Sequence, residues 1–162
     1  GGNVTLGDGK APEAMAIELS AHRHAIFEAN PQDGLLARTE HFLDPELGLT
    51  QEGMLSVQEK ATSTARLARM HTLLEFNSGW IGVEKGLAFL RDTHTAPDDK
   101  GSSEDNALCG PYTIQSTLFD PGSLTLWIAP GQILRSLAQG KGTMSPKLHV
   151  RLDLTVSLLG RH

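Results

Sequence analysis

The sequence predicts an α+β fold in which a pair of helices covers an antiparallel sheet. Two observations support this prediction. Apolar and polar residues alternate in the first quarter and again after residue 112, which is the period of a half-buried strand, whereas between residues 62 and 90 apolar residues recur at helical spacing. Strands, then helices, then strands again favour segregated layers over a chain of parallel βαβ units.

The first quarter of the chain is predicted to be a β-meander. Apolar residues alternate on both sides of the turn signals "GDGKAP", at Val4, Leu6, Met15, Ile17 and Leu19. Two further extended segments are predicted around residues 25–28 and 35–39, because Asn-Pro and Asp-Gly turn signals separate them. The second of these ends in the polar residues "RTEH", which an ordinary strand end would also explain.

Two helices are predicted in the middle of the chain. Either Thr62 or Ser63 can cap the first, whose apolar stripe consists of Leu67, Met70, Leu73 and Leu74. The second helix follows "NSGW" and ends before Pro97. Their order predicts an antiparallel helix pair.

The last third is predicted to return to strands after an exposed loop. Residues 96–106 are polar and rich in Ser, Gly and acids, which is typical of a surface loop. A hairpin follows, because two alternating runs flank the turn Asp120-Pro121-Gly122-Ser123. Alternation in residues 148–159 predicts a final strand.

Size and composition favour one soluble globular domain spanning residues 1–162. The formal charge of −5 and the absence of a Lys or Arg run argue against a nucleic-acid partner. We also expect no membrane association, because no apolar run approaches the length of a membrane span. A single cysteine, Cys109, cannot form an internal disulfide, so a reducing, cytoplasmic location is expected.

The familiar cofactor and metal motifs are missing from the sequence. There is no phosphate-binding glycine loop, no zinc-type Cys or His pairing and no Gly-x-Ser-x-Gly, so we expect no cofactor and no metal. His22 and His24 are interpreted as turn residues. Cys109 is interpreted as a small buried hydrophobe, although catalysis by its thiol is a third alternative. Asp92 and His94 fit a helix terminus better than an acid–base couple.

Five motifs, in this order and spacing, resemble one enzyme family. They are "GNVTLGD…AMAIELSA", "DGLLARTEHFLDP", "STARLARMHTLLE", "LAFLRDTHTAPDD" and "LCGPYTIQSTLFDPGSLTLWIAPG", and they span roughly residues 2 to 132. The family is the acyl-coenzyme A:6-aminopenicillanic acid acyltransferase-like group of linear-amide hydrolases, which belongs to the N-terminal-nucleophile hydrolases.

The resemblance implies a four-layer αββα fold and a self-cleaving precursor. Cleavage in that family exposes a cysteine whose own α-amino group takes the proton of its thiol, which then attacks a non-peptide amide. The family's nucleophile lies upstream of the region resembled here, and this sequence starts with Gly1 and Gly2. The chain is therefore expected to be the C-terminal portion of such an enzyme, while Cys109 matches a different family cysteine.

Glu40 marks a departure from the family pattern. "RTEHF" resembles the family's Thr-Asn-His-Phe, whose Asn helps to form the oxyanion hole. An ionised carboxylate only accepts hydrogen bonds and would repel an oxyanion. Glu40 is therefore a protonated donor, a residue with a different role, or the mark of an inactive site. We favour an ionised Glu40 that shapes a pocket or binds a cationic substrate group.

The expected site combines Glu40, at the catalytic position, with substrate-binding side chains. These are His41, Ser116 on the later hairpin and Arg66, which would brace the strand end. Strand alternation places Arg38 and Glu40 on one face and His41 on the other. The expected partners are a small amide or acyl-thioester substrate and either the missing N-terminal part, a second chain carrying the nucleophile, or a second copy. The alternative is a non-catalytic binding or scaffolding fragment.

Overall fold

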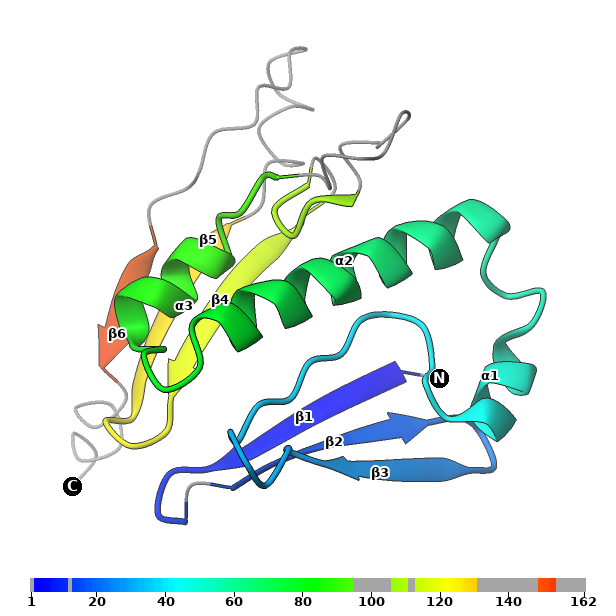
Figure 1. Cartoon of the computed structure of the whole chain (residues 1–162), viewed down its shortest axis with the longest axis horizontal. Helices are drawn as coiled ribbons and strands as arrows, with labels where there is room; N and C mark the ends of the chain where they lie inside the picture. The colour runs from blue at the N-terminus through cyan, green and yellow to red at the C-terminus, as the bar shows by residue number, and fades with distance from the viewer. Residues whose placement is uncertain (1, 12, 95–105, 111–112, 131–148, 154–162) are drawn as a thin grey trace, which may run out of the picture. The chain divides into compact units, whose positions relative to one another are not determined.

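The computed structural model describes residues 2–11, 13–94, 106–110, 113–130 and 149–153. The chain divides into two compact units, Gly1–Gly79 and Trp80–His162, and each is described by itself. Each unit contains an antiparallel three-stranded sheet and one or more helices (Figure 1). The predicted α+β class is therefore confirmed. The predicted single domain stays a prediction.

The first unit begins with the predicted meander. Strands β1 (Gly2–Asp8), β2 (Glu13–Leu19) and β3 (His24–Glu28) form an antiparallel sheet in the order β1-β2-β3. The register pairs Val4 with Ile17 and Ile17 with Ile26, so these side chains share one face. The predicted hairpin and third extended segment are confirmed.

The two faces of this sheet differ sharply in exposure. On one face Ala16 and Glu18 are fully buried. On the other face apolar side chains remain open to solvent, with Val4 at 42%, Leu6 at 48% and Ile26 at 57% exposure. A sheet normally buries one face against another layer, and here the buried face is the one with small and acidic residues.

The predicted extended segment at residues 35–39 forms no strand, and this prediction was wrong. The chain from Leu35 to Asp44, hereafter the bridging segment, pairs with no strand of the described structure. It passes between the β1–β3 sheet and the long helix of the unit (Figure 1). The physical reason is that side chains, and not a neighbouring strand, take up much of its backbone hydrogen bonding.

A short helix, α1 (Pro45–Gln51), follows the bridging segment and was not predicted. Its sequence signals are nevertheless strong. The Asp44 carboxylate caps the helix by accepting from the Leu47 N–H at 2.9 Å, and proline stands at the first helical position. Leu47, only 1% exposed, anchors the helix in the core.

Helix α2 (Val57–Phe76) begins before both predicted caps, Thr62 and Ser63. Ser56 is the true cap. Its hydroxyl accepts from the Glu59 N–H at 3.2 Å while the Glu59 carboxylate accepts from the Ser56 N–H at 2.7 Å, which makes a complete capping box. Thr62 and Ser63 lie inside the helix and are buried, so the predicted helix is confirmed and its predicted start is wrong.

The second unit contains the predicted second helix, the later hairpin and part of the predicted final strand. Helix α3 (Val83–Phe89) is followed by strands β4 (Gln115–Asp120), β5 (Thr125–Pro130) and β6 (Val150–Asp153), in the order β4-β5-β6. The predicted hairpin is confirmed, and so is the described part of the final strand. A Cβ on Gly86 would lie 3.0 Å from the Leu118 side chain, so glycine lets α3 approach β4 closely.

Two predictions from sequence stay open. The exposed loop at residues 96–106 lies outside the described residues, apart from Asn106. The antiparallel helix pair joins α2 of the first unit to α3 of the second, so it remains a prediction. In the part of the chain that the structure describes, none of the helices combines the length and hydrophobicity needed to cross a membrane.

Candidate functional site

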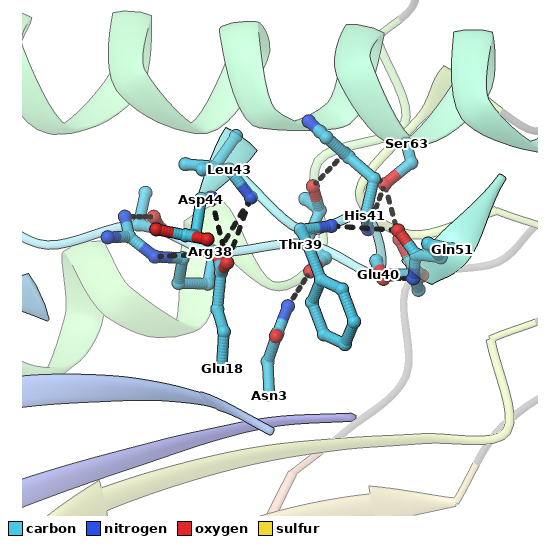
Figure 2. Close-up of polar contacts among 12 residues, drawn as sticks. Asn3, Glu18, Arg38, Thr39, Glu40, His41, Leu43, Asp44, Gln51 and Ser63 are labelled. Carbon is cyan, nitrogen blue, oxygen red and sulfur yellow. Dashed lines mark hydrogen bonds and ion pairs between the residues drawn. The ribbon is translucent and has the colours of Figure 1, made fainter. Parts of the chain in front are cut away.

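The candidate site lies on the bridging segment, whose backbone is bound by side chains from both sides. Figure 2 shows these contacts. On the sheet side, the Asn3 amide of β1 donates to the carbonyl of Thr39. On the other side, the Gln51 side chain of α1 donates to the Glu40 carbonyl at 3.0 Å and accepts from the Phe42 N–H at 2.9 Å. Gln51 thus replaces a neighbouring strand for residues 40–42.

Glu18, on β2, holds the end of the bridging segment. Its fully buried carboxylate accepts from the Leu43 N–H at 2.9 and 3.0 Å and from the Asp44 N–H at 3.0 Å. The Arg38 Nε lies 3.7 Å from Glu18 Oε1, and the Arg38 guanidinium stacks 4.1 Å from the centre of the Phe27 ring. A buried carboxylate needs such donors, because an unpaired charge is costly away from water.

Ser63, on α2, is the centre of the polar cluster that surrounds Glu40. Its hydroxyl donates to Glu40 Oε2 at 3.0 Å and accepts from the His41 N–H at 3.2 Å. The His41 Nδ1 lies 2.8 Å from the same oxygen. Since the single hydroxyl proton of Ser63 is directed to Glu40, we assign the proton of this contact to His41 Nδ1.

The Glu40 carboxylate is paired and remains largely exposed. The Arg66 guanidinium donates to Glu40 Oε2 at 2.7 Å, and 62% of the Glu40 side chain is open to solvent. Burial by itself raises the pKa of the Glu40 carboxyl, but the hydrogen bonds from Arg66 and Ser63 and the charge of Arg66 outweigh it. The pKa of Glu40 therefore lies below its ordinary value. Glu40 is ionised at neutral pH.

His41 is buried beside this carboxylate, with 7% of the residue exposed. Burial lowers its pKa, and the positive charge of Lys60 lowers it further, while the negative charges of Glu18 and Glu40 offset only part of the effect. The Thr39 hydroxyl lies 3.2 Å from His41 Nδ1. His41 is thus neutral at pH 7 and held by two hydroxyl groups.

The cluster of Glu40, His41 and Ser63 is not a nucleophile triad. In a triad the carboxylate orients the imidazole, which in turn takes the proton of an accessible hydroxyl. Here the carboxylate contacts the hydroxyl of Ser63 directly, and Ser63 is only 1% exposed. Among the described residues, no group of three or more His, Cys, Asp or Glu side chains is arranged to hold a metal ion.

Three of the four predicted site residues come together in the structure. Glu40 contacts Arg66 directly, and His41 joins them through Ser63. Ser116 belongs to the second unit, so its predicted place beside Glu40 stays a prediction. The predicted brace by Arg66 is present, although it acts on the bridging segment and not on a strand.

Sequence reasoning missed Glu18, Gln51 and Ser63 as parts of this site. The sequence pattern offers Ser63 only as one of two helix caps, beside Thr62. The position of Glu18 could have been recognised from the sequence. It shares a strand face with Ala14 and Ala16, and small side chains leave room for a segment that covers this face. No local pattern points to Gln51, since its contacts are set by the packing of α1.

The second unit holds a separate, very small hollow. Its lining includes Cys109, Ser116, Arg91 and His149. The Arg91 Nε donates a hydrogen bond to the His149 Nδ1 at 3.3 Å. Cys109 therefore has basic neighbours in space that its local sequence does not show. Its hollow has a volume of only about 10 Å³, roughly one water molecule.

Comparison with known proteins adds no assignment. No protein-family model, curated protein or solved structure matches this chain. Any function for the site is therefore a proposal, argued from the sequence motifs and the geometry described above.

Proposed function

We propose that this chain is the C-terminal part of an autoprocessed amidohydrolase or acyltransferase of the αββα N-terminal-nucleophile class. The reaction would be attack of a cysteine thiol, supplied from outside these residues, on a non-peptide amide. The amine leaves with the thiol proton, and water or an acceptor amine then takes the acyl group. The chain contributes the sheets, the helices and part of the pocket wall.

The observation that supports this proposal is the arrangement of Glu40, at the position of the family's oxyanion-hole Asn. Side chains from β1, β2, α1 and α2 hold the segment that carries it, which is the preorganisation that a binding group needs. Because Glu40 is ionised, it cannot donate a hydrogen bond to an oxyanion. We therefore assign it to binding a cationic group of the substrate.

The first test is intact-mass analysis of the natively purified protein under denaturing conditions. A second polypeptide that begins with cysteine is the expected result. Linear amides with and without an ammonium group are then compared as substrates. Glu40→Gln should raise KM about tenfold or more for the cationic amides and leave the neutral amides unchanged, since only the charge is removed.

Glu46→Gln is the matched control for this experiment. Glu46 is 61% exposed and pairs with Arg23, so it resembles Glu40 in exposure and pairing but lies outside the cluster. Equal effects of the two substitutions would refute the assigned role of Glu40. An increase in kcat for Glu40→Asn on neutral amides would instead show that this position acts on the oxyanion.

A non-catalytic binding or scaffolding fragment is the second candidate. It is favoured by the burial of His41 and Ser63, which makes the cluster an internal brace with a single exposed carboxylate. Under this alternative the purified protein contains this chain alone and hydrolyses no amide. A third alternative, hydrolysis by Cys109, requires that alkylation of that thiol abolish any amidase activity.

A further inference from the structure

A hollow of about 160 Å³ lies between α1 and the beginning of α2. A designed cavity of about 150 Å³ holds benzene, so this volume suits a ligand of similar size. The hollow adjoins the cluster around Glu40 but is distinct from it, because Glu40, Ser63 and Arg66 do not line it. Nothing in the proposed amide chemistry uses it.

The walls of the hollow are held by side-chain contacts. Gln51, one of the lining residues, is bound through both ends of its amide to the backbone of residues 40–42. Ser56, another lining residue, is fixed by its capping box with Glu59. A ligand entering here would therefore meet a wall that is already formed, which lowers the entropic cost of binding.

Two opposite charges line the hollow. Glu52 is at the end of α1 and Lys60 is in the first turns of α2. No ion pair joins Glu52 to Lys60 or to any other residue described in the structure. The positive charge of Lys60 also acts on the neighbouring cluster, because it lowers the pKa of His41. Both charges are therefore available to a ligand.

Apolar side chains complete the lining. Phe42, Leu55 and Val57 contribute hydrocarbon, and Val57 is 90% exposed at the rim. An apolar ligand group placed here would remove part of this surface from water. Pockets for small molecules commonly combine such an apolar wall with a few polar groups that set orientation.

We propose that this hollow binds a small zwitterion with a short apolar group, such as an aliphatic α-amino acid. Lys60 binds the carboxylate, Glu52 binds the ammonium group, and the apolar wall takes the side chain. A ligand of this size gains modest affinity, on the order of a millimolar dissociation constant. This inference is independent of the proposed amide chemistry.

The test is a titration of the full chain followed by the amide NMR signals of Gly48 and Gly53, which line the hollow. The probes are L-leucine, 4-methylpentanoate, which lacks the ammonium group, and 3-methylbutylamine, which lacks the carboxylate. We expect saturable shifts with leucine and at least tenfold weaker binding of both analogues. No saturable shift with leucine at 50 mM would overturn the proposal.

Charge-removing variants identify the two contacts. Lys60→Gln should weaken the binding of leucine and of 4-methylpentanoate about tenfold and leave the binding of 3-methylbutylamine unchanged. Glu52→Gln should weaken the binding of leucine and of 3-methylbutylamine and leave that of 4-methylpentanoate unchanged. Lys10→Gln and Glu13→Gln, at exposed positions in and beside the β1–β2 turn, are the matched controls. Equal loss in the controls would contradict the assignment.

Gly48→Leu tests the hollow without changing charge. A Cβ at Gly48 meets only the Phe42 carbonyl oxygen, at 4.0 Å, so the helix accepts a side chain there. Leucine also favours helix over glycine, which protects the fold. The variant should keep its circular dichroism spectrum and lose leucine binding. Unchanged binding in a folded Gly48→Leu variant would place the ligand elsewhere and overturn the proposal.

Discussion

At the scale of single residues, two carboxylates of the first unit lie in opposite surroundings. Glu18 is fully buried and accepts backbone hydrogen bonds from the bridging segment, so it stabilises the fold. Glu40 is mostly exposed and is supported by Arg66 and Ser63, so it can meet a ligand. Both side chains are glutamates, so the difference in exposure between Glu18 and Glu40 comes from their surroundings.

Glu18→Gln should destabilise the first unit by about 3–5 kcal/mol, the usual cost of removing one partner from a buried ion pair. The substitution leaves the Arg38 guanidinium without its counter-charge and weakens the acceptor for two N–H groups. Urea unfolding followed by NMR signals of β2 measures the change. Glu13→Gln, exposed on the same strand, should stay within about 0.5 kcal/mol, and an equal effect would contradict this role.

The buried neutral state of His41 predicts a pH dependence of stability. Because its pKa is lowered in the folded protein, the unfolded chain binds more protons, and stability rises with pH. The contribution is complete above the unfolded-state pKa of about 6.5 and is lost progressively as the pH falls from that value through the lower pKa of the folded state. The free energy of unfolding should therefore decrease between pH 7.5 and 5.5, and this decrease should be smaller in His41→Gln. An identical decrease in the variant would exclude His41 as the cause.

At the scale of elements, the bridging segment decides how the first unit is built. It separates the β1–β3 sheet from α2, and its hydrogen bonds come from four different elements (Figures 1 and 2). Helix α2 can begin early because Ser56 and Glu59 close its N-terminus. This early start places Ser63 about two turns into the helix, where its hydroxyl contacts Glu40.

Ser56→Ala should destabilise α2 by about 1 kcal/mol, the usual cost of losing a side-chain cap. The free energy of unfolding, measured in urea by far-UV circular dichroism, reports this change. Thr64→Ala is the control, because Thr64 is an exposed threonine inside the helix whose hydroxyl only bonds back to the Lys60 carbonyl. If Thr64→Ala cost as much as Ser56→Ala, the cap assignment would be wrong.

At the scale of the whole molecule, the open face of the β1–β3 sheet is the most informative feature. Val4, Leu6 and Ile26 expose 42–57% of their surface on a face that the register makes continuous. Contiguous apolar surface of this kind is typical of an interaction site. The expectation that the chain works with a further polypeptide or a second copy stays a prediction, and this face is where we would test it.

The double variant Val4→Thr, Ile26→Thr tests this expectation. Threonine suits a strand but removes apolar surface, so the sheet should remain folded. We expect the isolated wild-type chain to self-associate in light scattering after size-exclusion chromatography, and the variant to shift towards the monomer. Met54→Thr, which changes a 74% exposed side chain outside the sheet, should have no effect. A wild-type chain that stays monomeric at high concentration would contradict the prediction.

Much of the fold could be predicted from local pattern, and the candidate site only in part. The alternation of Met15, Ile17 and Leu19 identified β2, and the turn at Asp120 identified the later hairpin. The motif around Glu40 predicts that this segment carries the site, and this stays a prediction. Its partners Gln51 and Ser63 could not be found in the same way, because a hydrogen bond across eleven or twenty-three residues leaves no periodic signal.

The sequence by itself determined the α+β class, most strands and both predicted helices, because apolar periodicity and turn residues act over a few neighbouring positions. Only the tertiary structure decided that residues 35–39 form no strand and which groups surround the Glu40 carboxylate, whose ionised state the sequence already favoured. The physical reason is the same in both cases. Backbone hydrogen bonds and side-chain pKa values depend on which distant groups are brought near, here Gln51, Ser63 and Arg66.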